Sequence, residues 1–219
     1  MFGSIVPRYD KVNSLMTFGL DRRWRRQTGS MAQPRDMVAL DIATGTGELA
    51  FELVRQGAQI VVGADFCTDM LQAAKLKAAR SGMDSCIRLV AADAMRLPFA
   101  DATFDCVVNG FMLRNVEDLQ ATFVELCRVL RNRGRLVCLD LTPPQGAMRR
   151  FFRLYIAAFV PMLGVLVARN YGAYRYLFDS LSIHPDANQV AAMMRAAGFA
   201  EVCYELSGFG TVAIHRAVK

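Results

Sequence analysis

The sequence has few of the side chains from which metal sites and disulfide frameworks are built. It contains only two histidines, His184 and His215, and its six cysteines form no C-x-x-C pair. Structural zinc sites and disulfide frameworks need clustered histidine and cysteine. We therefore expect no bound metal, and we expect the cysteines to be buried free thiols in a reducing cytosol. Four of them lie in apolar strand-like runs: Cys86, Cys106, Cys138 and Cys203.

Segments that would carry the chain into a membrane are also lacking. The run LYIAAFVPMLGVLVA (154–168) is fifteen residues without a charge, which is shorter than the roughly 20 that a spanning helix needs. Pro161 and Gly164 interrupt it. The stretch MFGSIVPRYDKVNS (1–14) carries proline and charge where a signal peptide is apolar, so we expect no signal peptide and a cytoplasmic protein. Two interpretations of 154–168 remain, namely an apolar lid over a hydrophobic pocket and a shallow contact with the membrane interface.

What the sequence does have is enough apolar residues for one folded domain. Of its 219 residues, 53% are hydrophobic and 21% are charged, which is a globular composition. The net charge is +6, and four arginines crowd into DRRWRRQ (21–27) around the only tryptophan. A solvated basic helix end is one interpretation, and a peripheral contact with an anionic membrane is another. Nucleic acid is not expected, because no further basic stripe with interleaved aromatics follows.

Apolar runs alternate with amphipathic segments along most of the chain. This alternation predicts an α/β fold, a parallel sheet covered by helices on both faces. Near the end, EVCYEL (201–206) and TVAIHRA (211–217) face each other across SGFG, which predicts a hairpin and a final antiparallel strand. Residues 142–185 form an insertion. The expected strands before the hairpin are 37–42, 59–65, 86–93, 104–110 and 135–141, and the expected helices are 48–56, 68–81, 116–132 and 186–198.

The first expected strand ends in a glycine-rich turn, DIATGTGELA (41–50), which leads into a helix. Gly45 and Gly47 let the backbone approach a ligand, and the start of the helix offers free N–H groups. Dinucleotide folds bind pyrophosphate here and have a third glycine three residues after the second. Ala50 stands at that position. The loop alone is therefore a weak signal for a nucleotide-like cofactor, and a nicotinamide dehydrogenase is a weaker alternative.

Two carboxylates at strand ends strengthen the signal from this loop. Asp65 ends the second expected strand, twenty residues after Gly45, where a carboxylate can accept both ribose hydroxyls. Asp93 ends the third strand, where it could receive an adenine amino group. A ligand with ribose, adenine and a positive centre suits this set, and S-adenosylmethionine has all three. The alternative is that Asp65 and Asp93 only cap the loops that follow them.

An arginine directly follows the buried strand 104–110, in the stretch GFMLRNVED (110–118). Strands buried on both faces rarely end on an unpaired guanidinium. Arg114 therefore lies at the carboxyl edge of the sheet, where α/β folds bind ligands, and we expect it to meet an anion there. An ordinary ion pair with Glu117 or Asp118 is the alternative.

Seven segments spread along nearly the whole chain form a recognisable set. They are YDKVNSLMTFGLDRRWRR (9–26), LDIATGTGELA (40–50), LPFADATFDCVVNGFMLRNVED (97–118), RVLRNRGRL (128–136), YRYLFDSLSIHPD (174–186), AAGF (196–199) and VAIHRAVK (212–219). This set resembles the quinone-ring C-methyltransferases of ubiquinone and menaquinone biosynthesis. The first segment and LRNVED are specific to that family, whereas the glycine loop is shared by class I methyltransferases generally.

The resemblance implies one class I methyltransferase domain with a Rossmann-like sheet and S-adenosylmethionine as its cofactor. It also implies an N-terminal helical lid (1–35) and a helical substrate cap (142–185). Family motifs carry over Thr46, Asp65, Asp93, Ala94 and the backbone around Gly110. With the neighbouring loop and strand-end positions, the expected cofactor-binding residues are Asp41, Thr44, Gly45, Thr46, Gly47, Asp65, Phe66, Asp93, Ala94, Asn109 and Gly110.

The chain departs from the family pattern at several places near the expected site. Gly110 stands where the family usually has serine, so a backbone contact or neighbouring Asn109 would have to substitute. Met112 stands where the family has glycine and could reshape the ring pocket. LDLTPP (139–144) replaces a LEFSKP-like run, and the tail reads HRAVK instead of HRGYK.

The activity implied by the resemblance is transfer of a methyl group to a ring carbon of a reduced quinol with a polyprenyl tail. Arg114 is always protonated, so we interpret it as the cation that holds the quinolate oxygen, with Asn115 orienting it. His184 and His215 are the candidates for accepting the proton, although a lone histidine is more often structural. Tyr9 and Asp10 either close over the cofactor or cap the helix that follows.

Several alternatives stay open at this stage. The substrate could be a demethylmenaquinol, a ubiquinone-pathway benzoquinol, or a phospholipid amine. A scaffold that binds cofactor or lipid without catalysis is the alternative outside the enzymes, and Gly110 and Met112 are the residues that favour it. A homodimer is a further open expectation.

Overall fold

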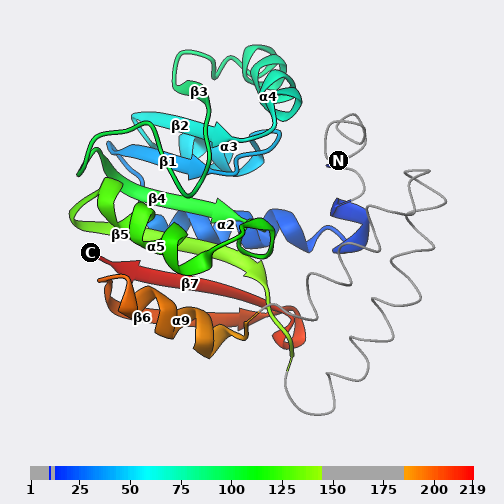
Figure 1. Cartoon of the computed structure of the whole chain (residues 1–219). Coiled ribbons are helices and arrows are strands. Elements are labelled where there is room, and N and C mark those ends of the chain that lie inside the picture. Colours follow the sequence, from blue (N-terminus) through cyan, green and yellow to red (C-terminus); the bar gives the residue numbers. More distant parts are fainter. Residues whose placement is uncertain (1–9, 11–12, 145–184) are drawn as a thin grey trace.

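The computed structural model describes residue 10 and residues 13–144 and 185–219. These residues form a seven-stranded sheet with helices on both faces (Figure 1). The strands are β1 (Val38–Ile42), β2 (Ile60–Asp65), β3 (Ile87–Ala91), β4 (Phe104–Gly110), β5 (Leu130–Leu141), β6 (Ala200–Ser207) and β7 (Val212–Val218). The helices are α2 (Leu20–Ala32), α3 (Glu48–Arg55), α4 (Thr68–Arg80), α5 (Leu119–Val129) and α9 (Ala187–Ala196), with single 3-10 turns η2 (Leu113–Asn115) and η5 (Gly208–Gly210).

The strand order in the sheet is β3-β2-β1-β4-β5-β7-β6. β1 pairs in parallel with both β2 and β4, so Leu40 lies between Val62 and Val107. β7 runs antiparallel to both of its neighbours, β5 and β6. The predicted α/β fold, with its C-terminal hairpin and antiparallel last strand, is confirmed. The chain order reverses between β1 and β4, and open α/β sheets bind ligands outside the carboxyl ends of strands at such a point.

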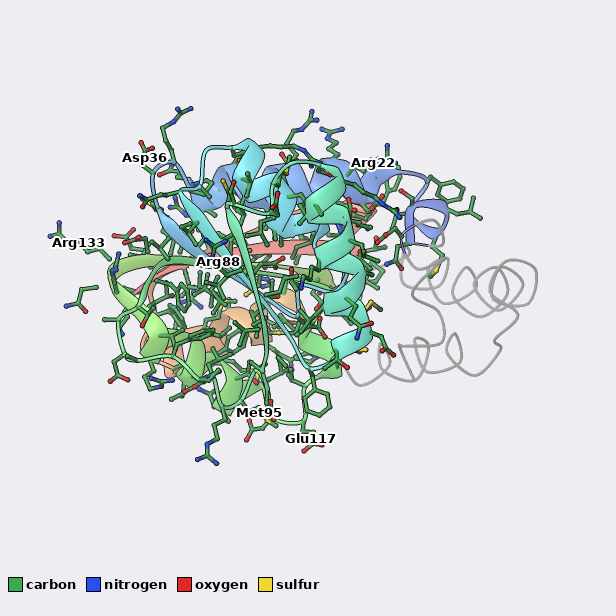
Figure 2. All side chains as sticks on the ribbon, turned by 90° about the horizontal axis from the view of Figure 1, so that it is seen from above. Arg22, Asp36, Arg88, Met95, Glu117 and Arg133 are labelled. Atoms are coloured by element: carbon green, nitrogen blue, oxygen red, sulfur yellow. The ribbon has the colours of Figure 1, made fainter. Side chains whose placement is uncertain are left out.

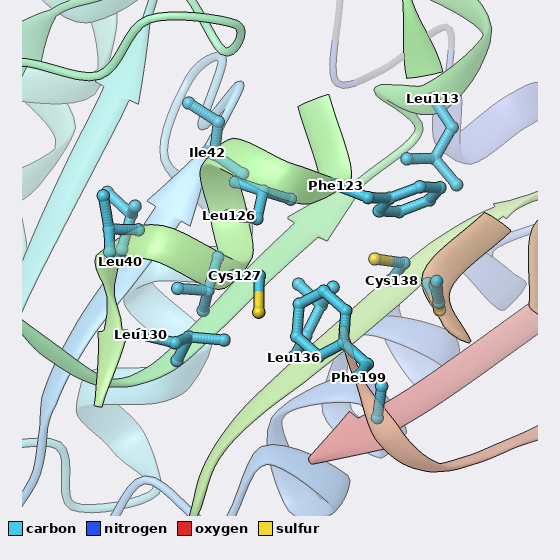
Figure 3. Packing of buried hydrophobic residues seen from close by; sticks show 14 of the residues in the cluster. Leu40, Ile42, Leu113, Phe123, Leu126, Cys127, Leu130, Leu136, Cys138 and Phe199 are labelled. Atoms are coloured by element: carbon cyan, nitrogen blue, oxygen red, sulfur yellow. The ribbon is translucent and has the colours of Figure 1, made fainter. Parts of the chain in front are cut away.

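Two layers of helices cover the sheet because its central strands are apolar on both sides. In β5, Leu136 and Cys138 pack in one buried cluster with α5 and α9, as Figure 3 shows. The intervening Val137 and Leu139 pack in a second cluster with residues of α2 and α3. This alternation follows from the two-residue period of a strand. Two packed faces explain why the strand sequences read as continuous apolar runs.

The basic run 21–27 divides between the interior and the solvent. Trp24 is buried against the sheet, and its indole Nε1 donates a 2.8 Å hydrogen bond to Ser207 Oγ at the end of β6. Arg22 and Arg23 are exposed, and Arg22 extends away from the ribbon in Figure 2. The later part of the expected N-terminal lid is therefore a helix of the core layer, held by its tryptophan.

Some boundaries and exposures differ from the sequence prediction. The helix expected at 116–132 begins only at Leu119, because the Asp118 side chain accepts from Ala121 N and caps it there. It ends at Val129, and Leu130 already has extended backbone and begins β5, five residues before the expected start at 135.

All six cysteines are free thiols, but only three of them are buried. Cys67 and Cys86 are half-buried and Cys203 is exposed, so the expectation of a buried thiol is wrong for these three residues.

Several expectations fall on residues outside the described ranges. They include the apolar run 154–168, nearly all of the expected cap 142–185, and most of the first twelve residues. Within the ranges that the structure describes, no helix is long and apolar enough to cross a membrane.

Candidate functional site

The loops at the carboxyl ends of β1, β2 and β4 bring most of the expected cofactor residues to one edge of the sheet. The register places Asp41 of β1 beside Gly63 of β2 and Val108 of β4. The segments 43–47, 66–67 and 111–115 therefore leave the sheet next to one another. β3 ends beside β2, since Ala91 pairs with Asp65, and this brings Asp93 to the same edge.

The glycine loop has the backbone that its sequence predicts. Gly45 and Gly47 have φ angles of 56° and 89°, in the left-handed region that favours glycine. A Cβ at Gly45 would meet nothing within 4 Å, whereas one at Gly47 would lie 3.1 Å from the Phe51 ring. Gly47 is thus needed for packing. Gly45 leaves open space over the loop, as the close approach of a ligand requires.

Asp41 is a buried carboxyl group at the start of this loop. It is 1% exposed, and its Oδ2 accepts a 2.6 Å hydrogen bond from Thr44 Oγ1. Its Oδ1 is buried and has no hydrogen-bond partner among the described residues. Burial raises the pKa of Asp41 to about 7, partly offset by the Thr44 hydrogen bond, the charge of Arg25 and the Ala50 backbone N–H, which makes no hydrogen bond of normal geometry to Oδ1. A buried acceptor without a partner fits a ligand that brings a donor, such as the ammonium group of S-adenosylmethionine.

Asp65 is oriented by the backbone of the loops around it. Its Oδ2 accepts from Gly45 N at 2.7 Å and its Oδ1 accepts from Cys67 N at 2.8 Å. Burial raises the pKa of Asp65, and its hydrogen bonds to backbone N–H groups oppose this. Each carboxylate oxygen has a second lone pair, so Asp65 can still accept from two ribose hydroxyls. Phe66 follows it and is 83% exposed, as a side chain available to stack on a ligand would be.

Asp93 and Ala94 lie farther along the same edge. Asp93 is exposed and its Oδ1 accepts from Met95 N at 2.9 Å, so it shapes its own turn. Its other oxygen, Oδ2, is not used in that bond. Ala94 is half-buried and packs against the cluster under α5. This arrangement fits the turn-capping interpretation and leaves room for the adenine interpretation.

Asn109 and Gly110 end β4 and differ in what they offer a ligand. Asn109 is fully buried, and its Nδ2 donates to Cys138 Sγ at 2.9 Å inside the sheet. Gly110 is half-buried, and a Cβ built on it would touch only Leu49 Cδ2, at 3.7 Å. Of the two expected substitutes for a serine, the Gly110 backbone is therefore placed better than the Asn109 side chain.

Arg114 forms an ion pair, but its partner is neither Glu117 nor Asp118. Its Nη1 lies 2.8 Å from Oδ1 of Asp140 at the end of β5, and the two side chains are 12% and 4% exposed. Asp140 also accepts from Leu113 N at 2.7 Å. The alternative of a pair with Glu117 or Asp118 is therefore wrong. Asp140 holds both the guanidinium and the turn that carries it.

Phe111 connects this arginine to a second one. The ring centroid of Phe111 lies 5.8 Å from Cζ of Arg114 and 5.7 Å from Cζ of Arg25 on α2. Both distances are in the range of cation–π contacts. Asn115 is exposed, and its Nδ2 donates to the Phe111 carbonyl at 3.1 Å, so it fixes the turn around the ring. Met112 is 2% exposed and packs in the core under α5.

The two histidines differ in what the structure shows. His184 lies outside the described residues. His215 is 2% exposed on β7, and its Nε2 donates to the Ala187 carbonyl at 2.9 Å. Its ring lies 5.2 Å from that of Tyr204. These contacts are those of a histidine that holds α9 against the hairpin.

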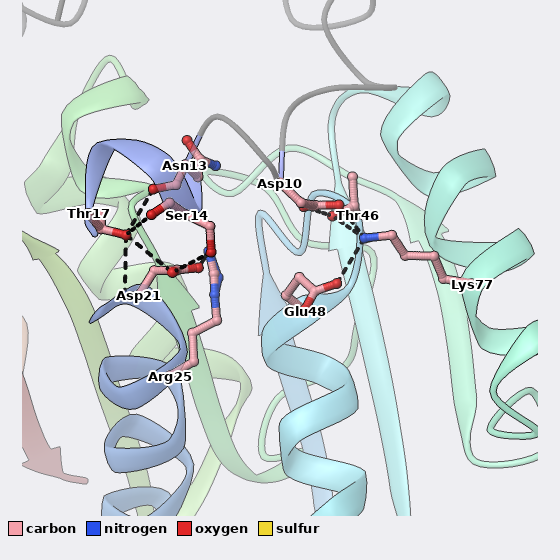
Figure 4. A network of polar contacts seen from close by, with 9 residues as sticks. All are labelled: Asp10, Asn13, Ser14, Thr17, Asp21, Arg25, Thr46, Glu48 and Lys77. Atoms are coloured by element: carbon pink, nitrogen blue, oxygen red, sulfur yellow. Dashed lines mark hydrogen bonds and ion pairs between the residues drawn. The ribbon is translucent and has the colours of Figure 1, made fainter. Parts of the chain in front are cut away.

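A polar network ties the N-terminal segment to the glycine loop, as the right half of Figure 4 shows. Lys77 of α4 pairs with Asp10 and donates to Glu48 Oε1 at 2.8 Å and to Thr46 Oγ1 at 3.1 Å. Thr46 Oγ1 in turn donates to Asp10 Oδ1 at 2.6 Å. Asp10 therefore contacts the glycine loop directly, which a helix cap alone does not require, and its closing over a cofactor stays a prediction.

Sequence reasoning missed three side chains of this site, namely Arg25, Lys77 and Asp140. Each reaches it from an element distant in the chain: Asp140 is 26 residues from Arg114, and Lys77 is 67 residues from Asp10. One signal could have revealed Asp140, because it ends a buried strand in LDLTPP, as Asp41 and Asp65 end theirs. Lys77 and Arg25 carry no such signal.

Known structures share this fold. A SAM-dependent methyltransferase from Aquifex aeolicus has a TM-score of 0.66 at 15% identity, covering 95% of this chain and 97% of that one. An S-adenosylmethionine-dependent methyltransferase from Mesorhizobium loti has a TM-score of 0.62 at 18% identity, covering 85% and 93%. At these identities the likeness establishes the fold alone.

Sequence comparisons reach further than the fold. A demethylmenaquinone methyltransferase from Thermus thermophilus is 46% identical over 219 residues, which is 98% of each chain. A ubiquinone/menaquinone biosynthesis C-methyltransferase, UbiE, from Desulfotalea psychrophila is 41% identical over 222 residues, covering 100% of this chain and 89% of that one. The profile of the ubiE/COQ5 methyltransferase family matches residues 1–219. The chain therefore belongs to the ubiE/COQ5 methyltransferase family.

Proposed function

We propose that this protein uses S-adenosylmethionine to methylate a ring carbon of a polyprenylated demethylmenaquinol, giving the menaquinol. The observation that carries the proposal is the buried Arg114–Asp140 pair at the end of β4 and β5, next to the glycine loop. A cation held this way suits an anionic ring oxygen beside a methyl donor. The name of the Thermus thermophilus relative supports the choice of ring.

Residues of the first two strand ends would hold the cofactor. Asp65 would accept the ribose hydroxyls, the space over Gly45 would admit the ligand, and Asp41 would accept the ammonium group. When bound, S-adenosylmethionine supplies an electrophilic methyl group on a sulfonium. The chain's own contribution is to place that methyl in line with a ring carbon, which lowers the barrier by orientation.

Arg114 would orient and stabilise the ring. Its Nη1 is taken by Asp140, which fixes the plane of the guanidinium and leaves other N–H groups for a quinol oxygen. Loss of the phenolic proton makes the carbon ortho to that oxygen nucleophilic, and the fixed N–H groups stabilise the negative charge. A guanidinium does not give up its proton, so Arg114 is not the base.

We propose that the phenolic proton passes to an acceptor other than His215, because that side chain is 2% exposed on β7 and its Nε2 donates to the Ala187 carbonyl. A positive charge next to a phenol lowers the pKa of that phenol. We therefore assign proton removal to water beside Arg114, with His184 as the remaining side-chain candidate.

The tail of the substrate calls for an apolar surface and a route from the membrane. We propose a peripheral contact with anionic lipid through the exposed arginines at the start of α2, Arg22 and Arg23. Basic residues near an anionic surface each contribute about 1 kcal/mol of attraction. Flotation with vesicles containing anionic lipid should carry the protein, and flotation with neutral vesicles should not. Equal flotation with both would reject the basic contact.

A direct assay tests the proposed reaction. Purified protein would be given methyl-labelled S-adenosylmethionine with a demethylmenaquinol or with the ubiquinone-pathway benzoquinol. We expect label in the naphthoquinol product at a higher rate than in the benzoquinol product. Faster methylation of the benzoquinol would reassign the substrate. Cofactor binding without turnover on either ring would favour the non-catalytic scaffold.

A further inference from the structure

A second arginine lies beside the glycine loop and has no part in the ring chemistry proposed above. Arg25 comes from α2, and its side chain is 14% exposed. Its guanidinium carbon stands 5.7 Å from the centre of the Phe111 ring. The β1–β4 register, in which Ile42 pairs with Asn109, brings the turn of Phe111 beside the loop that follows Asp41, and the charge of Arg25 also lowers the pKa of Asp41. Arg25 therefore faces the loop of β1 and the turn after β4 together.

One nitrogen of the Arg25 guanidinium, Nη2, lies near an acidic residue of the same helix, as the left half of Figure 4 shows. Nη2 lies 4.0 Å from Oδ2 of Asp21, one turn earlier in α2. Asp21 is itself held, because Ser14 Oγ donates to its Oδ1 at 2.9 Å and Thr17 Oγ1 does so at 3.2 Å. The guanidinium thus has a fixed place at the edge of the site.

A second nitrogen of the same guanidinium group, Nε, lacks a hydrogen-bond partner among the described residues. This nitrogen is buried, and Oδ1 of Asp41 is likewise buried and without a partner among those residues. Unpaired buried polar atoms cost free energy, and native structures contain few of them. Here one is a charged donor and the other is an acceptor. The α-carboxylate and α-ammonium groups of an amino acid would satisfy the two together.

We propose that Arg25 determines cofactor specificity by binding the α-carboxylate of the amino-acid end of the cofactor, while Asp41 receives its α-ammonium group. The inference rests on the proposed function, in which that cofactor is S-adenosylmethionine. Arg25 and Arg114 then bind two different anionic groups of the site. Arg25 takes the carboxylate of the cofactor, Arg114 takes the oxygen of the ring, and Phe111 lies in contact with both guanidinium groups.

A purely structural role predicts something different. If Arg25 only balanced the charge of Asp41, its loss would weaken every ligand that brings an ammonium group to Asp41. If Arg25 also binds the carboxylate, its loss weakens ligands that carry a carboxylate by a further factor. Decarboxylated S-adenosylmethionine lacks this group and keeps the amine and the sulfonium, so it separates the two roles.

The experiment is calorimetric titration of S-adenosylmethionine, S-adenosylhomocysteine and decarboxylated S-adenosylmethionine into wild type and variants. Arg25→Gln should weaken the two carboxylate ligands by about tenfold or more, the effect of losing a charged hydrogen bond. Binding of the decarboxylated ligand should weaken clearly less, because it loses only the charge that favours ionised Asp41. Arg26→Gln is the matched control, an arginine of the same helix with 79% of its side chain exposed, and should change none of the three.

The remaining outcomes would reject either the role of Arg25 or the proposed cofactor. Equal weakening of all three ligands, or weakening of none, overturns the assignment of Arg25. If wild type binds none of them, the proposed cofactor fails, and this is distinguishable from a failure at Arg25. If Arg25→Gln does not fold, Arg25→Lys decides, because lysine keeps the charge and lacks Nε. Its preference for the carboxylate ligands over the decarboxylated one should be smaller than that of wild type, and an unchanged preference overturns the proposal.

Discussion

Arg114 is a residue whose positive charge the protein has already partly balanced. Its pair with Asp140 is largely shielded from water, and such pairs gain little net stability, because desolvation offsets the Coulomb attraction. What the pair does provide is a fixed orientation of the Arg114 guanidinium, since Asp140 also accepts from Leu113 N in the same turn. We therefore regard Asp140 as a positioning residue that acts on the reaction through Arg114.

Replacing Asp140 should consequently impair turnover through Arg114 alone. We expect Asp140→Asn to lower kcat by about tenfold or more, a loss of transition-state stabilisation near 1.4 kcal/mol. Affinity for S-adenosylmethionine should stay within about twofold, and the free energy of unfolding should fall by roughly 3 kcal/mol, because one charge of a buried pair is left alone. Steady-state kinetics, calorimetry and urea unfolding measure the three quantities.

The decisive comparison for Asp140 is a double-mutant cycle with Arg114→Ala. If Asp140 acts through Arg114, adding Asp140→Asn to Arg114→Ala should leave kcat nearly unchanged. Additive losses would show that Asp140 has a role of its own. Asp101→Asn is the control, since Asp101 pairs with Arg128 on the surface with 78% of its side chain exposed, and such pairs contribute less than about 1 kcal/mol.

Asp41 is a residue where stability and binding oppose each other. Burial raises its pKa from 3.8 to about 7, so the folded protein without ligand keeps the proton longer than the unfolded chain does. Protonation of Asp41 therefore favours the folded state over the unfolded chain. This contribution to the free energy of unfolding is fully present below about pH 4 and is lost as pH rises through 7. Binding of an ammonium group requires the opposite, charged form. Arg25 and Asp65 are the charged groups that also act on this carboxyl.

Asp41→Asn should therefore stabilise the ligand-free protein and remove a pH dependence. Between pH 5 and pH 8, the free energy of unfolding of wild type should fall by about 3 kcal/mol relative to the variant. Wild-type affinity for S-adenosylmethionine should drop as pH falls below 7, whereas the weaker affinity of the variant should not follow pH. Urea unfolding and calorimetry across this range measure both. Parallel pH profiles in wild type and variant would contradict the prediction, and the exposed Asp36→Asn is the control.

Among the elements, the end of β4 is a place where the structure shows spare room. A Cβ on Gly110 would meet only Leu49 Cδ2, at 3.7 Å. Gly110→Ser should therefore leave the melting temperature nearly unchanged. One added hydrogen bond, worth about 1 kcal/mol, should raise affinity for S-adenosylmethionine roughly fivefold. Thermal unfolding and calorimetry measure these two effects.

Gly134→Ser, in β5, is the opposing control for that substitution. A Cβ at Gly134 would lie 2.8 Å from the Arg131 carbonyl oxygen. The melting temperature of this variant should therefore fall by several degrees. If Gly110→Ser destabilises the protein as much as Gly134→Ser does, the end of β4 is not as open as the contacts indicate.

The elements show how far the sequence predicts the structure. Strands and helices follow from hydrophobic period and glycine turns, which are local signals, so most strands lie close to their expected ranges. β5 is the exception, because it begins at Leu130 and not at 135. The start of α5 was missed by three residues because the cap at Asp118 outweighed the helical pattern of 116–118. The turn that carries Arg114 could not be predicted, for a different reason. The partner of Arg114 comes from another strand, and only the β4–β5 register brings Asp140 to it.

At the scale of the molecule, the site is built from loops that only the finished sheet brings together. Its side chains come from α2, α4, β1, β2, β4 and β5 or the loops that follow them, elements that together contribute to both buried clusters. A ligand held by all of them would connect the two helical layers across one edge of the sheet. Binding should then stabilise the whole domain and not a single loop.

The last prediction concerns this coupling. A ligand that binds only the folded state stabilises it by about 2.7 kcal/mol at 100 times its dissociation constant. For a domain of this size that corresponds to a rise in melting temperature of about 5–10 °C. We expect S-adenosylmethionine to give such a rise in thermal unfolding and NADH to give none, because Ala50 replaces the third glycine of the dinucleotide motif. A rise with NADH alone would assign the glycine loop to a nicotinamide cofactor. The transition should also stay single with S-adenosylmethionine, since the loops that contact it belong to one sheet, and a split transition would show that the ligand stabilises only part of the fold.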